Sequence, residues 1–247
     1  MIAIFVIPIT YSSMHHDASA GGSNYQEQVD DYNLAQIIHK QKILSIDSFM
    51  QEHHKRYNFQ GNVLVAYKGH IIYEGSFGYT TPRKRDPLEK NAIFQLASVT
   101  KQFTAMAALI AIEKDLLSYQ DTVTQYFPDF PYEGVTVHML LNHTAGLPNY
   151  MWLLEHYWQG EDIPYNTDVM RLLAKHKLNP HFRPGTRFGY SNTGYVVLAA
   201  IIEKASGMRF DKYMQQEVFN PLNMEDSFVQ SAAYPSEQQK HLDGYKY

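Results

Sequence analysis

A serine and a lysine three positions apart, Ser98 and Lys101, are the first residues in this chain that could do chemistry together. If the segment is helical, both side chains lie on one face and the amine reaches the hydroxyl. A serine hydroxyl needs a neighbouring base, and a lysine serves as one when burial lowers its pKa. The start of a helix also disfavours a protonated amine and stabilises an oxyanion. The spacing therefore indicates a nucleophilic serine, although it also fits a Ser98 that caps the helix beside an exposed Lys101.

A second polar group, Tyr190 to Asn192, follows a loop marked by Pro184, Gly185 and Gly189. A phenol can transfer protons, and an amide can donate to a substrate carbonyl while it accepts from a lysine. Ser191 or Asn192 also suits the cap of the apolar helical pattern that follows. Both roles are compatible, because a cap position holds its side chain rigidly.

The elements that must position these residues follow from hydrophobic periodicity. Two strand-like runs, 62–67 and 70–77, meet at Lys68-Gly69 and predict a hairpin. The apolar run after Ser98 predicts a helix buried on nearly all sides. The remaining helical patterns cover 32–57, 98–114, 137–141, 168–176, 192–206 and 210–219. Because strands and helices do not alternate, we expect an α+β fold rather than a doubly wound sheet.

Composition narrows the function classes. A chain of 247 residues with 45% hydrophobic and 19% charged residues is typical of a globular protein with a sizeable core. A net charge of −4 without a basic cluster argues against nucleic acid as a partner. The chain has no cysteine, and its 12 histidines form no ligand pattern, so we expect no metal and no cofactor.

The N-terminal segment resembles an export signal. The apolar run 1–11 is too short to span a bilayer, so we expect no stable membrane span, and Ala18-Ser19-Ala20 suits signal-peptidase cleavage. We therefore expect a signal peptide over 1–20, a linker over 21–31, and a periplasmic or secreted protein. A strand-forming leader is the alternative.

Three blocks carry a resemblance to a known family: FQLASVTKQFTA at 94–105, LLNHTAGLP at 140–148, and PGTRFGYSNTGY at 184–195. In this order they resemble the serine β-lactamase and penicillin-binding protein family, in the branch of class C β-lactamases, DD-peptidases and related esterases. The segments 61–79 and 221–224 resemble the first hairpin and a turn of that family. The resemblance covers roughly 32–229.

The resemblance implies a β-lactamase/transpeptidase-like domain over 32–247, with a partial antiparallel sheet flanked by helices (sheet lobe 32–97) and a mostly helical lobe (98–247). It implies that Ser98 is acylated, that Lys101 is its base partner, and that Tyr190 protonates the leaving group. Asn192 would orient the substrate amide or the Lys–Tyr pair, and the Ser98 backbone N–H would form half of an oxyanion hole. The turn at His143 would be a scaffold. The implied substrates are small molecules or peptidoglycan-type peptides: β-lactams, D-Ala-D-Ala peptides, or small esters and amides.

One family motif does not occur in the chain. The K-T-G or H-x-G strand motif expected after the helical lobe is missing, as are the closing strands and helix. We therefore expect a C-terminally truncated chain that is poorly stable and nearly inactive; a degenerate homologue is the alternative. A non-hydrolytic penicillin-binding sensor, or an inactive fragment, also stays open as a function. An α/β-hydrolase is disfavoured, because G-x-S-x-G is missed by one position. The oligomeric state and the substrate are left open.

Overall fold

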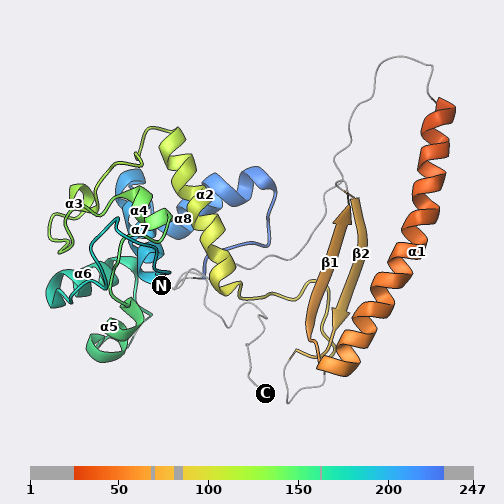
Figure 1. The fold of residues 1–247 in the computed structure, drawn as a ribbon, viewed down its shortest axis with the longest axis horizontal. Coiled ribbons are helices and arrows are strands. Elements are labelled where there is room, and N and C mark those ends of the chain that lie inside the picture. Colours follow the sequence, from red (N-terminus) through yellow and green to blue (C-terminus); the bar gives the residue numbers. More distant parts are fainter. Residues whose placement is uncertain (1–24, 68–69, 81–85, 162, 231–247) are drawn as a thin grey trace. The chain divides into compact units, whose positions relative to one another are not determined.

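The computed structural model describes residues 25–67, 70–80, 86–161 and 163–230 (Figure 1). The chain divides into two compact units, one within Pro8–Phe94 and the other within Gln95–Gln239. The predicted signal peptide, the turn at Lys68-Gly69 and the segment after residue 230 lie outside the described residues.

The first unit holds helix α1 (Tyr25–Tyr57) and strands β1 (Gly61–Tyr67) and β2 (His70–Phe77). The two strands pair antiparallel, Gly61 opposite Phe77, which confirms the predicted hairpin pairing. Helix α1 begins at Tyr25, so residues 25–31 are helical where a linker was expected. The polar run QEQVDDYN lacks the apolar spacing that would have extended the prediction.

Helix α1 lies along the hairpin and packs on β2 (Figure 1). Met50 from the helix meets Tyr73 and Phe77 from the strand in a small buried cluster. The Tyr73 hydroxyl donates to an Asp47 carboxylate oxygen at 3.0 Å, which satisfies the polar end of a buried ring. The helix therefore covers one face of the two-stranded sheet.

The second unit is helical. It holds α2 (Thr100–Glu113), α3 (Val123–Tyr126), α4 (Val137–Leu141), α5 (Tyr150–Tyr157), α6 (Asn166–His176), α7 (Asn192–Ser206) and α8 (Phe210–Met214). Short 3-10 turns cover Ala97–Val99 and Asn220–Leu222, and a π-helical turn covers Gln215–Phe219. Helices α4 and α7 have the predicted bounds, whereas α3 and α5 were not predicted.

Helix α7 is the centre of this unit. Its Val197, Leu198, Ile201 and Ile202 are fully buried, and it contacts α2, α3, α4, α6 and α8. Ser191 caps its start by accepting from the Gly194 N–H at 3.2 Å, and Gly207 ends it in the left-handed conformation. The helix that carries Asn192 is therefore fixed at both ends.

Helix α2 buries one face of small residues, with Ala107, Ala108 and Ala111 fully buried. Its Met106 and Leu109 are 49% and 40% exposed, so the expectation of burial on nearly all sides was wrong. Small side chains let α7 approach closely, and this contact decides which face of α2 is inside.

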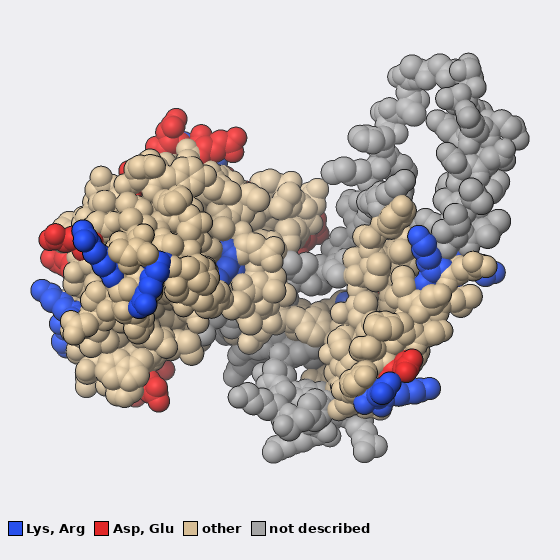
Figure 2. Space-filling model, in the orientation of Figure 1, with Lys and Arg blue, Asp and Glu red and all other residues tan. Residues whose placement is uncertain are grey.

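Charges of both signs are interspersed on the face of the molecule shown in Figure 2. None of the described helices is long and apolar enough to cross a membrane.

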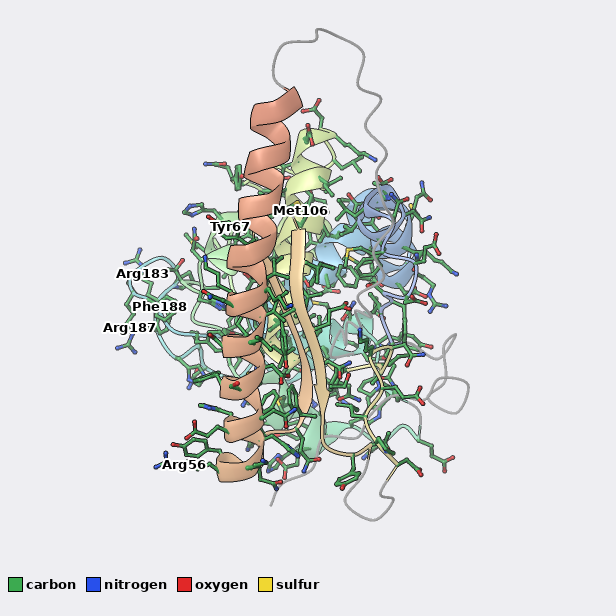
Figure 3. The ribbon with its side chains drawn as sticks, turned by 90° about the vertical axis from the view of Figure 1, so that its right-hand side faces the viewer. Arg56, Tyr67, Met106, Arg183, Arg187 and Phe188 are labelled. Atoms are coloured by element: carbon green, nitrogen blue, oxygen red, sulfur yellow. The ribbon has the colours of Figure 1, made fainter. Side chains whose placement is uncertain are left out.

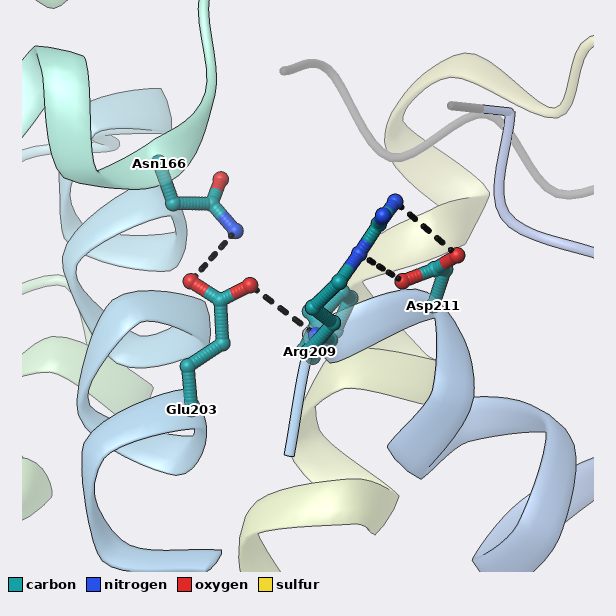
Figure 4. Close-up of polar contacts among 5 residues, drawn as sticks. Asn166, Glu203, Arg209 and Asp211 are labelled. Atoms are coloured by element: carbon teal, nitrogen blue, oxygen red, sulfur yellow. Dashed lines mark hydrogen bonds and ion pairs between the residues drawn. The ribbon is translucent and has the colours of Figure 1, made fainter. Parts of the chain in front are cut away.

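A polar network joins the helices α6, α7 and α8 (Figure 4). The Glu203 carboxylate on α7 accepts from the Phe210 N–H at the start of α8 at 2.9 Å, and more weakly from the Asn166 amide of α6 at 3.5 Å. Arg209 donates twice to Asp211 beside it, at 3.1 and 3.2 Å. Burial raises the pKa of the Glu203 carboxyl above its ordinary value.

This raised pKa predicts a pH-dependent stability. The folded chain binds the Glu203 proton more tightly than the unfolded chain, so the stabilising effect of that proton is full below the ordinary pKa of 4.5 and is lost as the pH rises through the folded pKa. Glu203→Gln removes this titration and keeps an acceptor for the Phe210 N–H. We expect the free energy of unfolding of Glu203→Gln, relative to wild type, to be higher at about pH 8 than at about pH 4. Urea unfolding measures it, with exposed Glu225→Gln as the control; an equal difference at both pH values would contradict the prediction.

Candidate active site

Ser98 stands on the 3-10 turn that precedes α2. The turn begins at Ala97, whose φ of +46° lies in the left-handed region that a non-glycine residue rarely adopts. No side-chain capping bond is made at the start of this turn or of α2, so Ser98 is not the cap that its sequence also suggested. Its hydroxyl is exposed and directed to other partners. Local strain of this kind commonly accompanies a functional side chain.

Lys101, in the first turn of α2, reaches both Ser98 and the start of α7. Its Nζ donates to Ser98 Oγ at 3.3 Å and to the Asn192 side-chain oxygen at 2.7 Å. The same nitrogen lies 4.9 Å from the centre of the Tyr190 ring and 5.7 Å from that of Tyr195. Two aromatic faces and an amide oxygen therefore fix the amine beside the serine.

Tyr190 completes the group. Its hydroxyl donates to Ser98 Oγ at 2.9 Å. Hydrogen bonds with Lys101 and with Ser98 lower the pKa of the Tyr190 phenol, and the charge of Lys101 acts in the same direction. The structure thus brings together all four residues that the sequence singled out: Ser98, Lys101, Tyr190 and Asn192.

A loop before α7 carries Tyr190, and backbone bonds tie it to the turn at 143–146. Gly189 N–H donates to the His143 carbonyl, Gly185 N–H to that of Thr144, and His181 N–H to that of Gly146, each at 2.8 Å. Gly146 has a φ of +69°, and a Cβ there would lie 2.3 Å from the Phe182 carbonyl oxygen. Glycine is therefore required for this close approach.

The outer part of the same loop extends into solvent. Arg183, Arg187 and Phe188 lie on it (Figure 3), and Phe188 is 68% exposed. The Arg187 guanidinium stacks over the Phe182 ring at 4.8 Å and donates to the His181 carbonyl at 3.2 Å. These contacts hold the loop against itself rather than against the helices.

Two hollows flank the group of four. A cavity of about 190 Å³ opens beside Ser98 and Lys101 and has mainly apolar walls, including Val196 and Ala199 from α7. The buried Thr100 hydroxyl lines it without a hydrogen-bond partner. A second, more polar hollow of about 420 Å³ is lined by Tyr190 and Asn192 together with Arg187. Ser98 lines the first hollow and Tyr190 the second, and Asn192 lines both.

Three contributions were missed from the sequence. Ala97 carries no residue-type signal for its left-handed backbone, and Tyr195 was given no role of its own. His143 was assigned to a scaffold turn, yet its ring lies 4.5 Å from that of Tyr190. Among the described residues, no group of three His, Asp or Glu is placed to hold a metal ion.

Comparison with known proteins assigns the family. The family model described as Beta-lactamase matches residues 46–246. The chain belongs to the Beta-lactamase family. It is 41% identical to penicillin-binding protein 4* of Bacillus subtilis (strain 168) over 194 residues, which cover 78% of this chain and 43% of that protein.

Solved structures of this family share the fold. A penicillin-binding protein from Bacillus halodurans superposes with a TM-score of 0.67 at 28% identity, covering 79% of this chain and 59% of that one. EstCE1, a hydrolase with promiscuous acyltransferase activity, gives a TM-score of 0.65 at 26% identity, covering 76% of this chain and 53% of that one. These matches confirm the β-lactamase/transpeptidase-like α+β fold. The chain spans less than half the length of penicillin-binding protein 4*.

The lowered pKa of Tyr190 predicts a titration that absorbance can follow. We expect one tyrosine to form phenolate below the ordinary pKa of 10.0, and Tyr190→Phe to remove that step. Lys101→Met should raise the pKa of Tyr190, because it removes both a hydrogen bond and a positive charge. Near-ultraviolet difference spectra over a pH series measure this, with Tyr119→Phe as the control. A first phenolate step that survives in Tyr190→Phe would refute the assignment.

Proposed function

We propose that this chain belongs to a serine hydrolase that transfers acyl groups through Ser98. The observation that carries the proposal is the convergence of Lys101 Nζ and the Tyr190 hydroxyl on one oxygen, Ser98 Oγ, at 3.3 and 2.9 Å. A hydroxyl with two proton-transferring neighbours fits nucleophilic catalysis. Membership in the Beta-lactamase family supports the same reaction class.

In the first step, Tyr190 reacts from its phenolate form, which its lowered pKa favours. Ser98 Oγ attacks the carbonyl carbon of the substrate and gives its proton to the Tyr190 oxygen, beside Lys101. The bond from that carbon to the leaving nitrogen or oxygen breaks, and Tyr190 returns the proton to the leaving group. The product is an ester of Ser98. The Ser98 backbone N–H, at the start of α2, would donate to the oxyanion, and the helix start would stabilise its charge.

In the second step, a water molecule gives a proton to the same Tyr190 oxygen and attacks the ester carbonyl. The C–O bond to Ser98 breaks, Ser98 recovers its proton, and a carboxylic acid leaves. Asn192 holds Lys101 in place through both steps by its 2.7 Å bond. No cofactor is needed for this sequence of proton transfers.

The substrate class follows as part of the proposal: a β-lactam, a D-Ala-D-Ala peptide, or a small ester or amide. The mainly apolar cavity beside Ser98 supports an acyl part of modest size, since an apolar cavity of about 150 Å³ can hold benzene. We place the protein outside the cytoplasm, in the periplasm or secreted, where such substrates occur.

A second candidate is a penicillin-binding module that is acylated and stays acylated. The 41% identity to penicillin-binding protein 4* supports it. The two candidates differ only in the second step, so the ratio of product released to chain labelled separates them.

Acylation of Ser98 is tested in the whole protein to which this chain belongs, with a fluorescent penicillin and a short-chain ester. We expect Ser98→Ala to lose labelling and turnover, and Tyr190→Phe to lower kcat by about 10²–10⁴-fold. Ser118→Ala is the matched control, because Ser118 lies beyond the opposite end of α2. Labelling that persists in Ser98→Ala would refute the proposal, and labelling at one equivalent without product release would favour the binding module.

A further inference from the structure

The His143 imidazole packs against three aromatic rings at the candidate site. Its centre lies 4.5 Å from that of the Tyr190 ring and 5.1 Å from that of the Tyr195 ring. The planes of these two rings are tilted against the imidazole by 32° and 34°. The Phe188 ring meets it edge-on at 5.9 Å. His143 therefore forms the support on which the Tyr190 ring lies.

His143 also binds the backbone on both sides of Tyr190. The Gly189 N–H donates to the His143 carbonyl at 2.8 Å, and the Ser191 N–H donates to His143 Nδ1 at 3.1 Å. A backbone N–H can only donate, so Nδ1 has to be unprotonated in this arrangement. The neutral ring then carries its proton on Nε2.

We propose that neutral His143 is a positioning residue that holds Tyr190 in reach of Ser98, and that protonation of its ring releases Tyr190. The inference rests on the proposed function and adds a source of pH dependence to it. A proton on Nδ1 removes the acceptor of the Ser191 N–H and places two donors against each other. Tyr190, held between Gly189 and Ser191, loses one of its two anchors.

Burial and the neighbouring charged and titratable groups set the pH at which this happens. Lys101 approaches from α2, the phenols of Tyr190 and Tyr195 face the ring from the loop and from α7, and exposed His138 lies on α4 just before the turn. Burial lowers the pKa of His143 below its ordinary value of 6.5, and the charge of Lys101 lowers it further. The neutral form therefore prevails at neutral pH, and the arrangement is lost as the pH falls through this lowered pKa.

Two variants separate the contribution of the His143 ring from that of its acceptor nitrogen, Nδ1. His143→Asn keeps an oxygen near the place of Nδ1, tolerates the φ of +58°, and does not titrate. His143→Phe keeps the ring and loses the acceptor. His138→Asn, at the exposed histidine of α4, is the matched control.

The first readout needs no substrate. With ¹³C-labelled histidine and tyrosine, the Tyr190 ring signal should change at the pH where His143 titrates in wild type and in His138→Asn, and should lose that step in His143→Asn. A Tyr190 signal without this step in wild type, or with the step retained in His143→Asn, would overturn the inference. This result is independent of whether the chain turns over any substrate.

The second readout is acylation by the fluorescent penicillin. We expect the maximal acylation rate of His143→Phe to fall about 10–100-fold, because the Tyr190 hydroxyl moves away from Ser98 Oγ. The penicillin concentration that gives half of the maximal rate should change little. His143→Asn should keep more acylation activity than His143→Phe. In wild type the acylation rate should fall at acid pH (the acid limb of its pH profile), and His143→Asn should lose that fall. An unchanged acid limb in His143→Asn would also overturn the inference, whereas labelling that persists in Ser98→Ala would refute only the proposed function.

Discussion

The hydrogen bond from Lys101 Nζ to the Asn192 side-chain oxygen, 2.7 Å long, joins two helix starts that are 91 residues apart in the chain. Ser98 lies two residues before the first residue of α2, and Tyr190 lies two residues before that of α7, so fixing these two starts brings the hydroxyl groups together. The fully buried Ala107, Ala108 and Ala111 of α2 permit the contact with α7 that keeps the starts in register. A larger side chain on that face would separate the helices and, with them, the polar group.

The parts of this arrangement that follow local rules were predictable. The three-residue spacing of Ser98 and Lys101 and the loop signal before Asn192 predicted four side chains that the structure places together. The bounds of α4 and α7 matched the prediction, because Thr136 and Ser191 cap their starts and Gly207 ends α7. The roles of these side chains in a reaction stay predictions.

Other features depend on contacts between distant segments, and no local pattern carries them. The left-handed backbone of Ala97 is imposed by the surrounding packing, because alanine does not favour it. The buried helix predicted from Ser98 instead begins with a 3-10 turn and leaves Met106 exposed. Likewise the single helix predicted over 210–219 is α-helical only in its first half, and a π-helical turn forms the second half, Gln215–Phe219.

Gly146 has no functional group, yet its missing side chain limits how this site can vary in evolution. The loop that carries Tyr190 crosses it so closely that any β-carbon would meet the Phe182 carbonyl oxygen. A lineage could exchange residues along the exposed outer loop, including Phe188, and keep the same approach of the two segments. At position 146 no side chain fits without moving the loop, so a residue that does no chemistry is nevertheless constrained to be glycine.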